Sequence, residues 1–391
     1  MRPACLNQLQ QDPGCGEKTL MTNFERFVRT INWEIPDRLM TYDFVDHRAL
    51  FENYGGGGDL IERNARMASR IGLDITRYVY DPDHHWMGAK IQNWIRFFGV
   101  DSSSWQVSEA GGTAWISRRP FNDLKGLERN MPNMPKKSEI EEWFKPAIRT
   151  IKEVYDSFDV VFIGAVEGPL TDAYTYSDMT LFCEAIYEAP ELVDRLIEVC
   201  GTFSQYIAEV FAENPSAPLM FMGEDVAGSQ GPIFSLDFIR QKALPMWKQI
   251  AKPIKDKGFK FLYHTDGKAE KILPLVVNEL GADGFNPIER NGCNDIFEIR
   301  RNYPRTLLFG NVCCETTLPY GAPEDVEKET RELVEKLGPQ GGILIGSSSE
   351  VHDLIPAENA LRMYQTVRKY GSYPIRNPTT PTCDPSHPPG S

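Results

Sequence analysis

The stretch Phe259-Lys-Phe-Leu-Tyr-His-Thr-Asp-Gly267 decides how the rest of the chain is interpreted. Its apolar and aromatic residues run directly into the polar pair His264 and Asp266, a pattern typical of a short buried strand and its carboxyl end. In folds with a parallel sheet, the carboxyl ends of the strands present the reacting groups. The alternative is a strand, a turn and a helix N-cap without chemistry. This stretch by itself leaves both interpretations open.

Seven further segments repeat the pattern of a short apolar strand, most of them followed by a helix. Together with 259–264, the predicted strands lie near 39–45, 74–80, 159–165, 219–223, 284–288, 307–312 and 342–346. Eight such units predict an α/β fold of the (β/α)8 type, a TIM barrel, with an aromatic-rich insertion after the second strand. A doubly wound open sheet is the alternative. Such a sheet usually carries a glycine-rich dinucleotide turn, and we find none in a suitable place.

The barrel is expected to form a single domain over residues 22–372. Residues 82–135 contain many aromatic, Gly and Ser residues and are expected to form an inserted helix and hairpin over one end. The tryptophans of this insertion either pack in the core or belong to a lid over a substrate. We expect residues 1–21 to be a disordered extension and 373–391, rich in Pro, Thr and Ser, to be a disordered tail.

The composition excludes several classes of partner. The chain has 42 basic and 55 acidic residues, so its formal net charge is −13. Because nucleic acids and anionic membranes bind basic surfaces, we expect neither as a partner. No apolar run is long enough to span a membrane, and residues 1–20 lack the apolar core of a secretion signal. Eight scattered cysteines without a CxxC pair indicate free thiols in a cytoplasmic protein.

In a barrel, the residues that follow the strands converge at one mouth. The expected set is mostly acidic and includes Asp43, Asp46, Asp81, Glu167, Glu224, Asp225, His264, Asp266, Glu289, Asn311, Cys313, the segment 347–350 and His352. Two kinds of chemistry fit these residue types, a zinc site with an open position and acid–base catalysis by groups of different pKa. The candidate zinc ligands are His264, Asp266, Glu289, Cys313 and His352. The candidate catalytic residues are His264, Asp266, Glu224, Asp225 and Asn311.

Each candidate also has a structural interpretation. Asp266 precedes a glycine and is therefore typical of a turn or cap. Glu224 and Asp225 are suited to accept hydrogen bonds from backbone donors. Cys313 and Cys314 are of a type that more often packs in the core than binds a metal.

Several motifs occur together in a characteristic order. They are Phe24-Glu-Arg-Phe-Val-Arg-Thr-Ile-Asn with Pro36-Asp-Arg, Glu167-Gly-Pro-Leu-Thr-Asp-Ala-Tyr174, Gly223-Glu-Asp-Val-Ala-Gly-Ser-Gln-Gly-Pro-Ile-Phe-Ser235 with Leu244-Pro245, His264-Thr-Asp-Gly267, and Gly310-Asn311. In this order the chain resembles the uroporphyrinogen decarboxylase superfamily, which includes cobalamin-dependent methyltransferases. The resemblance covers about residues 22–372 and implies a (β/α)8 barrel, in agreement with the strand count.

Departures from the family patterns favour one branch. True uroporphyrinogen decarboxylases clamp their acidic tetrapyrrole with an arginine-rich segment, whereas the corresponding residues 40–47 are acidic here. The methyltransferases usually bind zinc through His-x-Cys and a distant Cys. This chain has His264-Thr-Asp266 in the first place and Ser or Glu near 347–350 in the second. An oxygen- and nitrogen-rich set of this kind resembles the branch that demethylates ethers or amines.

The resemblance therefore implies a methyltransferase, a demethylase component. It is expected to move a methyl group from a small methoxylated aromatic or methylamine-type donor to a corrinoid (cobalamin) carried by a separate protein. Zinc or an acid would activate the leaving atom, and the aromatic residues of 86–115 would pack a methoxylated ring. The alternatives are decarboxylation of another carboxylic acid and tetrapyrrole or corrinoid binding without chemistry. A homodimer is expected from the family alone.

Overall fold

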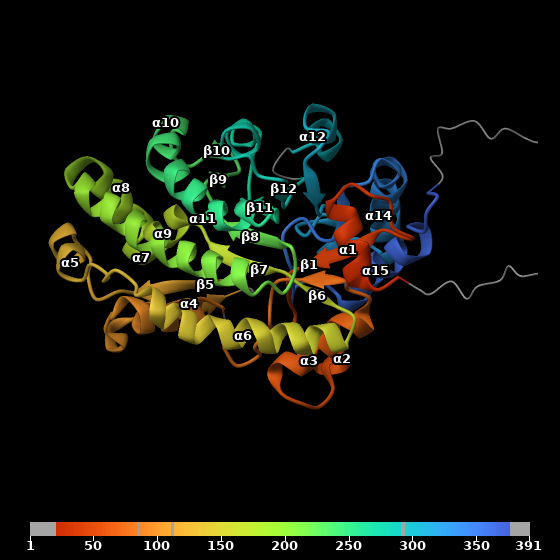
Figure 1. The fold of residues 1–391 in the computed structure, drawn as a ribbon, viewed down its shortest axis with the longest axis horizontal. Coiled ribbons are helices and arrows are strands. Elements are labelled where there is room, and N and C mark those ends of the chain that lie inside the picture. The colour runs from red at the N-terminus through yellow and green to blue at the C-terminus, as the bar shows by residue number, and fades with distance from the viewer. Residues whose placement is uncertain (1–20, 85, 111–112, 291–293, 376–391) are drawn as a thin grey trace, which may run out of the picture.

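A parallel sheet forms a nearly closed barrel with helices around it (Figure 1). The computed structural model describes residues 21–84, 86–110, 113–290 and 294–375; most of the predicted extension and tail lies outside these residues. Hydrogen-bonded neighbours follow the order β6-β3-β1-β14-β13-β12-β11-β8-β7. The strands are β1 (Met40–Asp43), β3 (Ile75–Thr76), β6 (Val161–Phe162), β7 (Gly164–Glu167), β8 (Leu219–Gly223), β11 (Lys260–His264), β12 (Gly284–Asn286), β13 (Leu307–Phe309) and β14 (Ile343–Ile345).

The predicted TIM barrel is confirmed. Each of the eight predicted positions carries a strand, and the third position is divided by Ile163 into β6 and β7. The two ends of the sheet order are therefore consecutive pieces of chain, and the sheet returns on itself. Every pair within the sheet is parallel. This closure excludes the doubly wound open sheet.

Side chains of successive strand residues alternate between the barrel interior and the surrounding helices. Phe221 of β8 and Leu262 of β11 belong to the buried cluster inside the barrel. Phe261 and Tyr263 pack instead in the layer between the sheet and the helices. His264 is two residues after Leu262 and therefore points to the same face of β11. Its ring therefore continues the inner row to the carboxyl end of β11.

Helices follow most of the strands and cover the outside of the barrel. Their bounds are α1 (Asn23–Ile31), α2 (Arg48–Gly55), α3 (Leu60–Ile71), α6 (Lys137–Ser157), α7 (Pro169–Ser177), α8 (Met179–Glu188), α9 (Pro190–Glu213), α10 (Leu236–Phe238), α11 (Leu244–Asp256), α12 (Ile296–Asn302), α13 (Thr317–Tyr320), α14 (Pro323–Leu337) and α15 (Ala357–Tyr370). Among the helices that the structure describes, none is long and apolar enough to cross a membrane.

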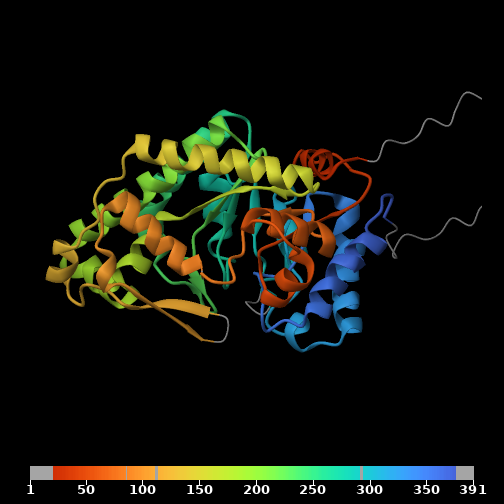
Figure 2. The ribbon, with the colours of Figure 1, turned by 90° about the horizontal axis from the view of Figure 1, so that it is seen from below.

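An insertion between β3 and β6 extends the barrel at one end. It contains α4 (Trp86–Asn93), a π-helical turn (Trp94–Phe98), the hairpin of β4 (Gln106–Ala110) and β5 (Thr113–Arg118), and α5 (Leu124–Arg129). In Figures 1 and 2 this segment lies beside α7, α8 and α9 and far from α14 and α15. We call residues 86–129 the insertion. Part of its aromatic content is core, since the Trp94 ring lies 5.4 Å from that of Trp105 and 5.2 Å from that of Tyr176.

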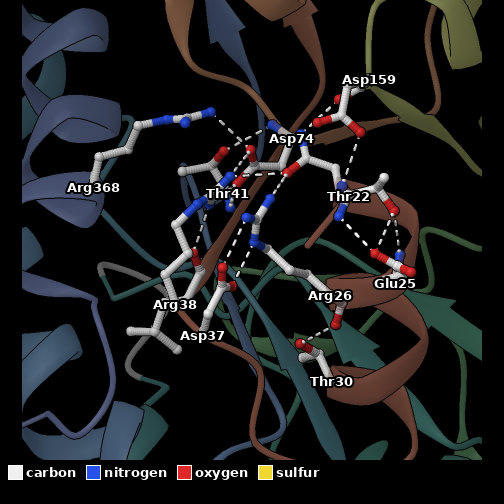
Figure 3. A network of polar contacts seen from close by, with 12 residues as sticks. Thr22, Glu25, Arg26, Thr30, Asp37, Arg38, Thr41, Asp74, Asp159 and Arg368 are labelled. Atoms are coloured by element: carbon white, nitrogen blue, oxygen red, sulfur yellow. Dashed lines mark hydrogen bonds and ion pairs between the residues drawn. The ribbon is translucent and has the colours of Figure 1, made fainter. Parts of the chain in front are cut away.

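A buried carboxylate joins the first strands of the barrel to its last helix (Figure 3). Asp74, at the amino end of β3, accepts hydrogen bonds from the two terminal nitrogens of Arg38 at 2.7 and 2.8 Å. It also accepts from Arg368 of α15 at 2.8 Å and from the backbone N–H of Thr41 in β1 at 3.0 Å. The side chain of Asp74 is fully buried. These donors compensate its charge in a place where water cannot.

The network continues from Asp74 to α1. Arg26 binds Asp37 at 2.6 Å and, like Arg38, donates to the side-chain oxygen of Asn23. The backbone N–H of Asn23 in turn donates to Asp159 at 2.9 Å. The first helix is thereby fixed to the segments that lead into β1 and β6.

We expect Asp74→Ala to lower the free energy of unfolding by about 3–5 kcal/mol, because Arg38 and Arg368 would lose their buried counter-ion. Urea unfolding followed by circular dichroism measures the change. Asp256→Ala is the matched control, since Asp256 pairs with Lys252 on the exposed surface of α11. It should change stability by less than about 0.5 kcal/mol. Equal effects of the two substitutions would contradict the role given to Asp74.

Candidate active site

The strand end at His264 opens into a cavity of about 430 Å³. The ends of β3, β8 and β11, the segment after β14, α7 and the insertion all contribute to its wall. Seven aromatic side chains line it, which makes the wall suitable for a flat apolar ligand. They are Phe44, Tyr78, Trp86, Trp94, Tyr174, Phe203 and Phe221. A more open groove of about 990 Å³ along α13 and α14 contains none of the predicted site residues.

Three of the predicted residues meet on this wall. The Nε2 atom of His264 lies 3.4 Å from Asp225 Oδ1 and 3.8 Å from Asp266 Oδ1. The backbone N–H of Asp266 donates to Asp225 Oδ1 at 3.3 Å. Within the described part of the chain, these residues are the one group of three His, Cys, Asp or Glu with ligand atoms mutually within 4.8 Å. We call Asp225, His264 and Asp266 the trio.

Asn286 sets the orientation of the His264 ring. The side-chain N–H₂ of Asn286 donates to the carbonyl of Phe309 at 3.3 Å, so its Oδ1 is the acceptor that faces His264. That oxygen lies 2.8 Å from His264 Nδ1, which therefore carries a proton. Nε2 is left to face the two carboxylates and the cavity. In catalytic and metal-binding histidines, a hydrogen bond from one ring nitrogen commonly fixes the orientation of the ring, while the other nitrogen binds the metal or the substrate.

The charges of the trio are strongly coupled. Burial acts to lower the pKa of His264, but the carboxylates of Asp266 and Asp225 outweigh burial and raise this pKa to about 9. Burial acts to raise the pKa of Asp225, but the hydrogen bond and charge of His264 bring it below its usual value. The pKa of Asp266 is raised by burial and by the neighbouring charge of Asp225. Without a metal, the trio at neutral pH therefore holds an imidazolium beside carboxylate.

The donor atoms of the trio also fit a zinc ion. One imidazole nitrogen and two carboxylate oxygens are ligand types that zinc accepts, and a catalytic zinc keeps three protein ligands and one open position. The trio lines the cavity, so an open position would face a substrate. Asn286 supplies the outer hydrogen bond that metal-binding histidines usually make.

Glu289, Cys313 and His352 are not part of this group. Glu289 accepts a hydrogen bond from the backbone N–H of Gly267 at 2.7 Å, and burial together with the charge of Asp266 raises its pKa to about 7. Cys313 is buried, and its sulfur accepts a hydrogen bond from Thr316 at 3.1 Å. His352 lies in β15 (Val351–His352), which pairs with β2 (Val45–Asp46). None of these three residues lines the cavity.

Glu224 and Asn311 are buried beneath the mouth and do not line the cavity. Asn311 donates to the carbonyl of Ile288 at 2.5 Å. Glu224 accepts from the backbone N–H groups of Leu170 and Thr171, at 3.0 and 2.9 Å, and from the indole of Trp247 at 2.7 Å. Burial raises the pKa of Glu224 to about 7. The carboxylate thus attaches the first turn of α7 to α11.

Two basic residues of the cavity were not predicted. Lys90 of α4 lies 3.2 Å from Glu167 and 3.1 Å from Asp172, and the attraction of these carboxylates outweighs burial and raises its pKa. Lys90 is therefore a charged link between the insertion and the barrel. Arg77 follows β3 directly and also lines the cavity.

Sequence patterns could have pointed to both Lys90 and Arg77. Trp86, Lys90, Asn93 and Trp94 are spaced so that they share one face of a helix, and all four line the cavity. Arg77 was not identified because the predicted strand at 74–80 is too long and places this residue inside the strand. The observed β3 ends at Thr76, so Arg77 occupies a strand end like His264.

Comparisons with known proteins agree with this architecture. Residues 104–370 match the uroporphyrinogen decarboxylase (URO-D) family. The chain belongs to this family. The methylcobamide:CoM methyltransferases MtbA of Methanosarcina acetivorans and Methanosarcina mazei are each 21% identical over 224 residues, which is 57% of this chain and 62% of theirs. A uroporphyrinogen decarboxylase of a Synechococcus species is 22% identical over 208 residues, 52% of this chain and 55% of its own.

The matched part of this chain spans less than two thirds of the length of each of these three relatives. A solved structure, a methyltransferase from Methanosarcina mazei, matches 89% of this chain and 99% of its own length with a TM-score of 0.65 at 18% identity. That match shows a shared fold. The predicted superfamily is confirmed, and within it the chain stands nearer to the methyltransferases than to plain uroporphyrinogen decarboxylase.

We expect Glu224→Ala to lower the free energy of unfolding by about 2–4 kcal/mol, since three buried donors would lose their acceptor. Gly168→Ala should destabilise in the same direction, because an added Cβ would lie 1.9 Å from Glu224 Oε2. Gly228→Ala is the matched control, with no atom within 4 Å of its added Cβ. Urea titrations measure all three. Unchanged stability of Glu224→Ala with loss of activity would assign Glu224 to chemistry.

Proposed function

We propose that this protein moves a methyl group from a small methoxylated aromatic or methylamine-type donor to a corrinoid carried by a separate protein. The observation that carries the proposal is the trio, which faces a cavity with seven aromatic residues in its wall. The relatives whose names describe methyl transfer from methylcobamide support the same class of reaction. The O- or N-demethylase role is the finer part of the proposal.

The reaction needs help at the leaving atom. The carbon–oxygen or carbon–nitrogen bond of the donor breaks as the methyl carbon bonds to the Co(I) corrinoid of the acceptor, the second substrate, which supplies both electrons of the new bond. The leaving oxygen or nitrogen keeps the electron pair of the broken bond, and a proton delivered there makes its departure easier. The protonated Nε2 of His264 faces the cavity and is the group placed to deliver that proton. Asp225 and Asp266 hold the imidazolium in place through their charges.

Zinc is the second means by which the trio would serve this reaction. His264, Asp225 and Asp266 would hold the ion, and its contribution would be Lewis-acid activation of the leaving oxygen or nitrogen. In either case Asn286 orients the imidazole. The aromatic wall would hold the donor and keep water away from the reacting atoms.

Decarboxylation is the second candidate, because the chain belongs to the URO-D family. The charge of the cavity does not favour uroporphyrinogen itself. Among the described residues of the wall, Glu167, Asp172, Asp225, Asp266 and Glu350 are accompanied by two basic residues besides His264, namely Arg77 and Lys90. A substrate with eight carboxylates would meet mainly like charge there. Release of carbon dioxide from a smaller acid, undiminished by chelators, would support this candidate.

We expect His264→Ala to lower the rate of methyl transfer at least about 100-fold, because the leaving atom would lose its activating group. The assay follows methylation of a Co(I) corrinoid protein by its absorbance, with aryl methyl ethers and methylamines as donors. His84→Ala is the matched control, since His84 pairs with Asp81 on the exposed surface at 3.0 Å. Absence of transfer by the unaltered protein across the whole donor panel would reject the proposed function.

Metal removal separates the two forms of activation. If zinc acts at the trio, elemental analysis should find it in an equimolar ratio, and Asp225→Asn or Asp266→Asn should lose it. Dialysis against a chelator should then abolish methyl transfer, and added zinc should restore it. Full activity of a zinc-free protein would show that His264 acts as a proton donor instead.

A further inference from the structure

We infer that Arg77 binds an anionic group of the methyl donor, so that methoxylated aromatic acids are preferred to methylamines. The inference rests on the proposed function, because it names the substrate class of the same site. It concerns a residue whose role in the cavity is separate from that of the trio.

Arg77 is held in place by its neighbours. The central carbon of its guanidinium lies 4.6 Å from the ring centre of Phe44 and 4.0 Å from that of Phe221. Its Nε donates to the hydroxyl of Tyr42 at 3.2 Å. Packing and this hydrogen bond leave the two terminal nitrogens as the donors available to a ligand. A guanidinium held in this way offers a pair of parallel N–H groups that matches the two oxygens of a carboxylate.

Within the described part of the chain, the Arg77 guanidinium forms no ion pair. Across the described residues, no carboxylate oxygen lies within 4.0 Å of its guanidinium, whereas Lys90 meets both Glu167 and Asp172 at that range. Asp266 and Glu350 are attracted by Arg77 through space without contacting it. Arg77 is thus the basic group of the described cavity wall that a ligand can still neutralise. The negative charges of Asp266 and Glu350 favour a ligand with one carboxylate over a ligand with several.

Phe221 connects this subsite to the trio. Its ring contacts Arg77 and also lies 5.1 Å, centre to centre, from the ring of His264. An aromatic acid lying along this wall can place its carboxylate at Arg77 and its ether oxygen toward His264. Beside Arg77, in contrast to the acidic remainder of the wall, a methylammonium ion is disfavoured, because Phe44 and Phe221 already contact one cation and Arg77 would repel another.

The test compares two probes that differ by one charge, 4-methoxybenzoate and 4-methoxybenzamide, by isothermal titration calorimetry. We expect the unaltered protein to bind the benzoate about tenfold or more tightly than the benzamide. Arg77→Gln should remove that difference by weakening only the benzoate, and Arg77→Lys should retain part of it. Arg96→Gln is the matched control, because Arg96 packs on Trp143 at 3.7 Å and does not line the cavity.

Equal binding of the two probes by the unaltered protein would overturn the inference, even if Arg77→Gln fails to fold. Tighter binding of tetramethylammonium than of the benzoate would overturn it as well, as would an equal loss of both probes in a folded Arg77→Gln variant. These measurements do not require methyl transfer. Benzoate binding that depends on Arg77 in a protein without transfer activity would therefore keep the anion subsite and reject only the proposed function.

Discussion

A barrel forms only if its first and last segments meet, and the buried carboxylate of Asp74 holds them at that place. Arg38 reaches it from the segment before β1, and Arg368 from the last helix. A buried charge without partners costs several kcal/mol, so the three side chains stabilise the fold only as a set. β3, which begins directly after Asp74, is positioned by this set, and β3 delivers Arg77 to the mouth.

At the carboxyl ends of the strands, the pairing of neighbouring strands positions the residues of the candidate active site. The register of β11 and β12 pairs His264 with Asn286, and that of β11 and β8 pairs His264 with Gly223. Paired residues of neighbouring strands point to the same face, so the side chain of Asn286 stands beside the imidazole. On the other side, Gly223 leaves room for the ring of Phe221, because an added Cβ would lie 3.2 Å from that ring. The orientation of His264 is therefore a result of strand register rather than of a flexible loop.

The barrel and the place of His264 could be predicted because strand patterns and strand ends are local properties of sequence. The rest of the site depends on features that sequence patterns do not encode. Glu224 follows a strand just as Asp225 does, but its carboxylate turns toward α7 and Trp247, and only the backbone beyond β8 decides that direction. Lys90 reaches the mouth because the insertion packs on the barrel. Arg77 was missed because β3 has two residues instead of the predicted seven.

Lys90 connects two parts of the chain that both line the cavity. The trio and Asn286 come from the barrel, whereas Trp86 and Trp94 come from the insertion, and the lysine joins the two through Glu167 and Asp172. The candidate metal-binding and proton-donating residues therefore all come from the barrel, whereas the aromatic wall of the cavity is shared between the barrel and the insertion. Provided that the lysine, its carboxylates and the packed aromatic residues remain, exposed positions of the insertion can accumulate substitutions without contact with the trio. Such an arrangement lets the cavity change its shape while the trio stays the same.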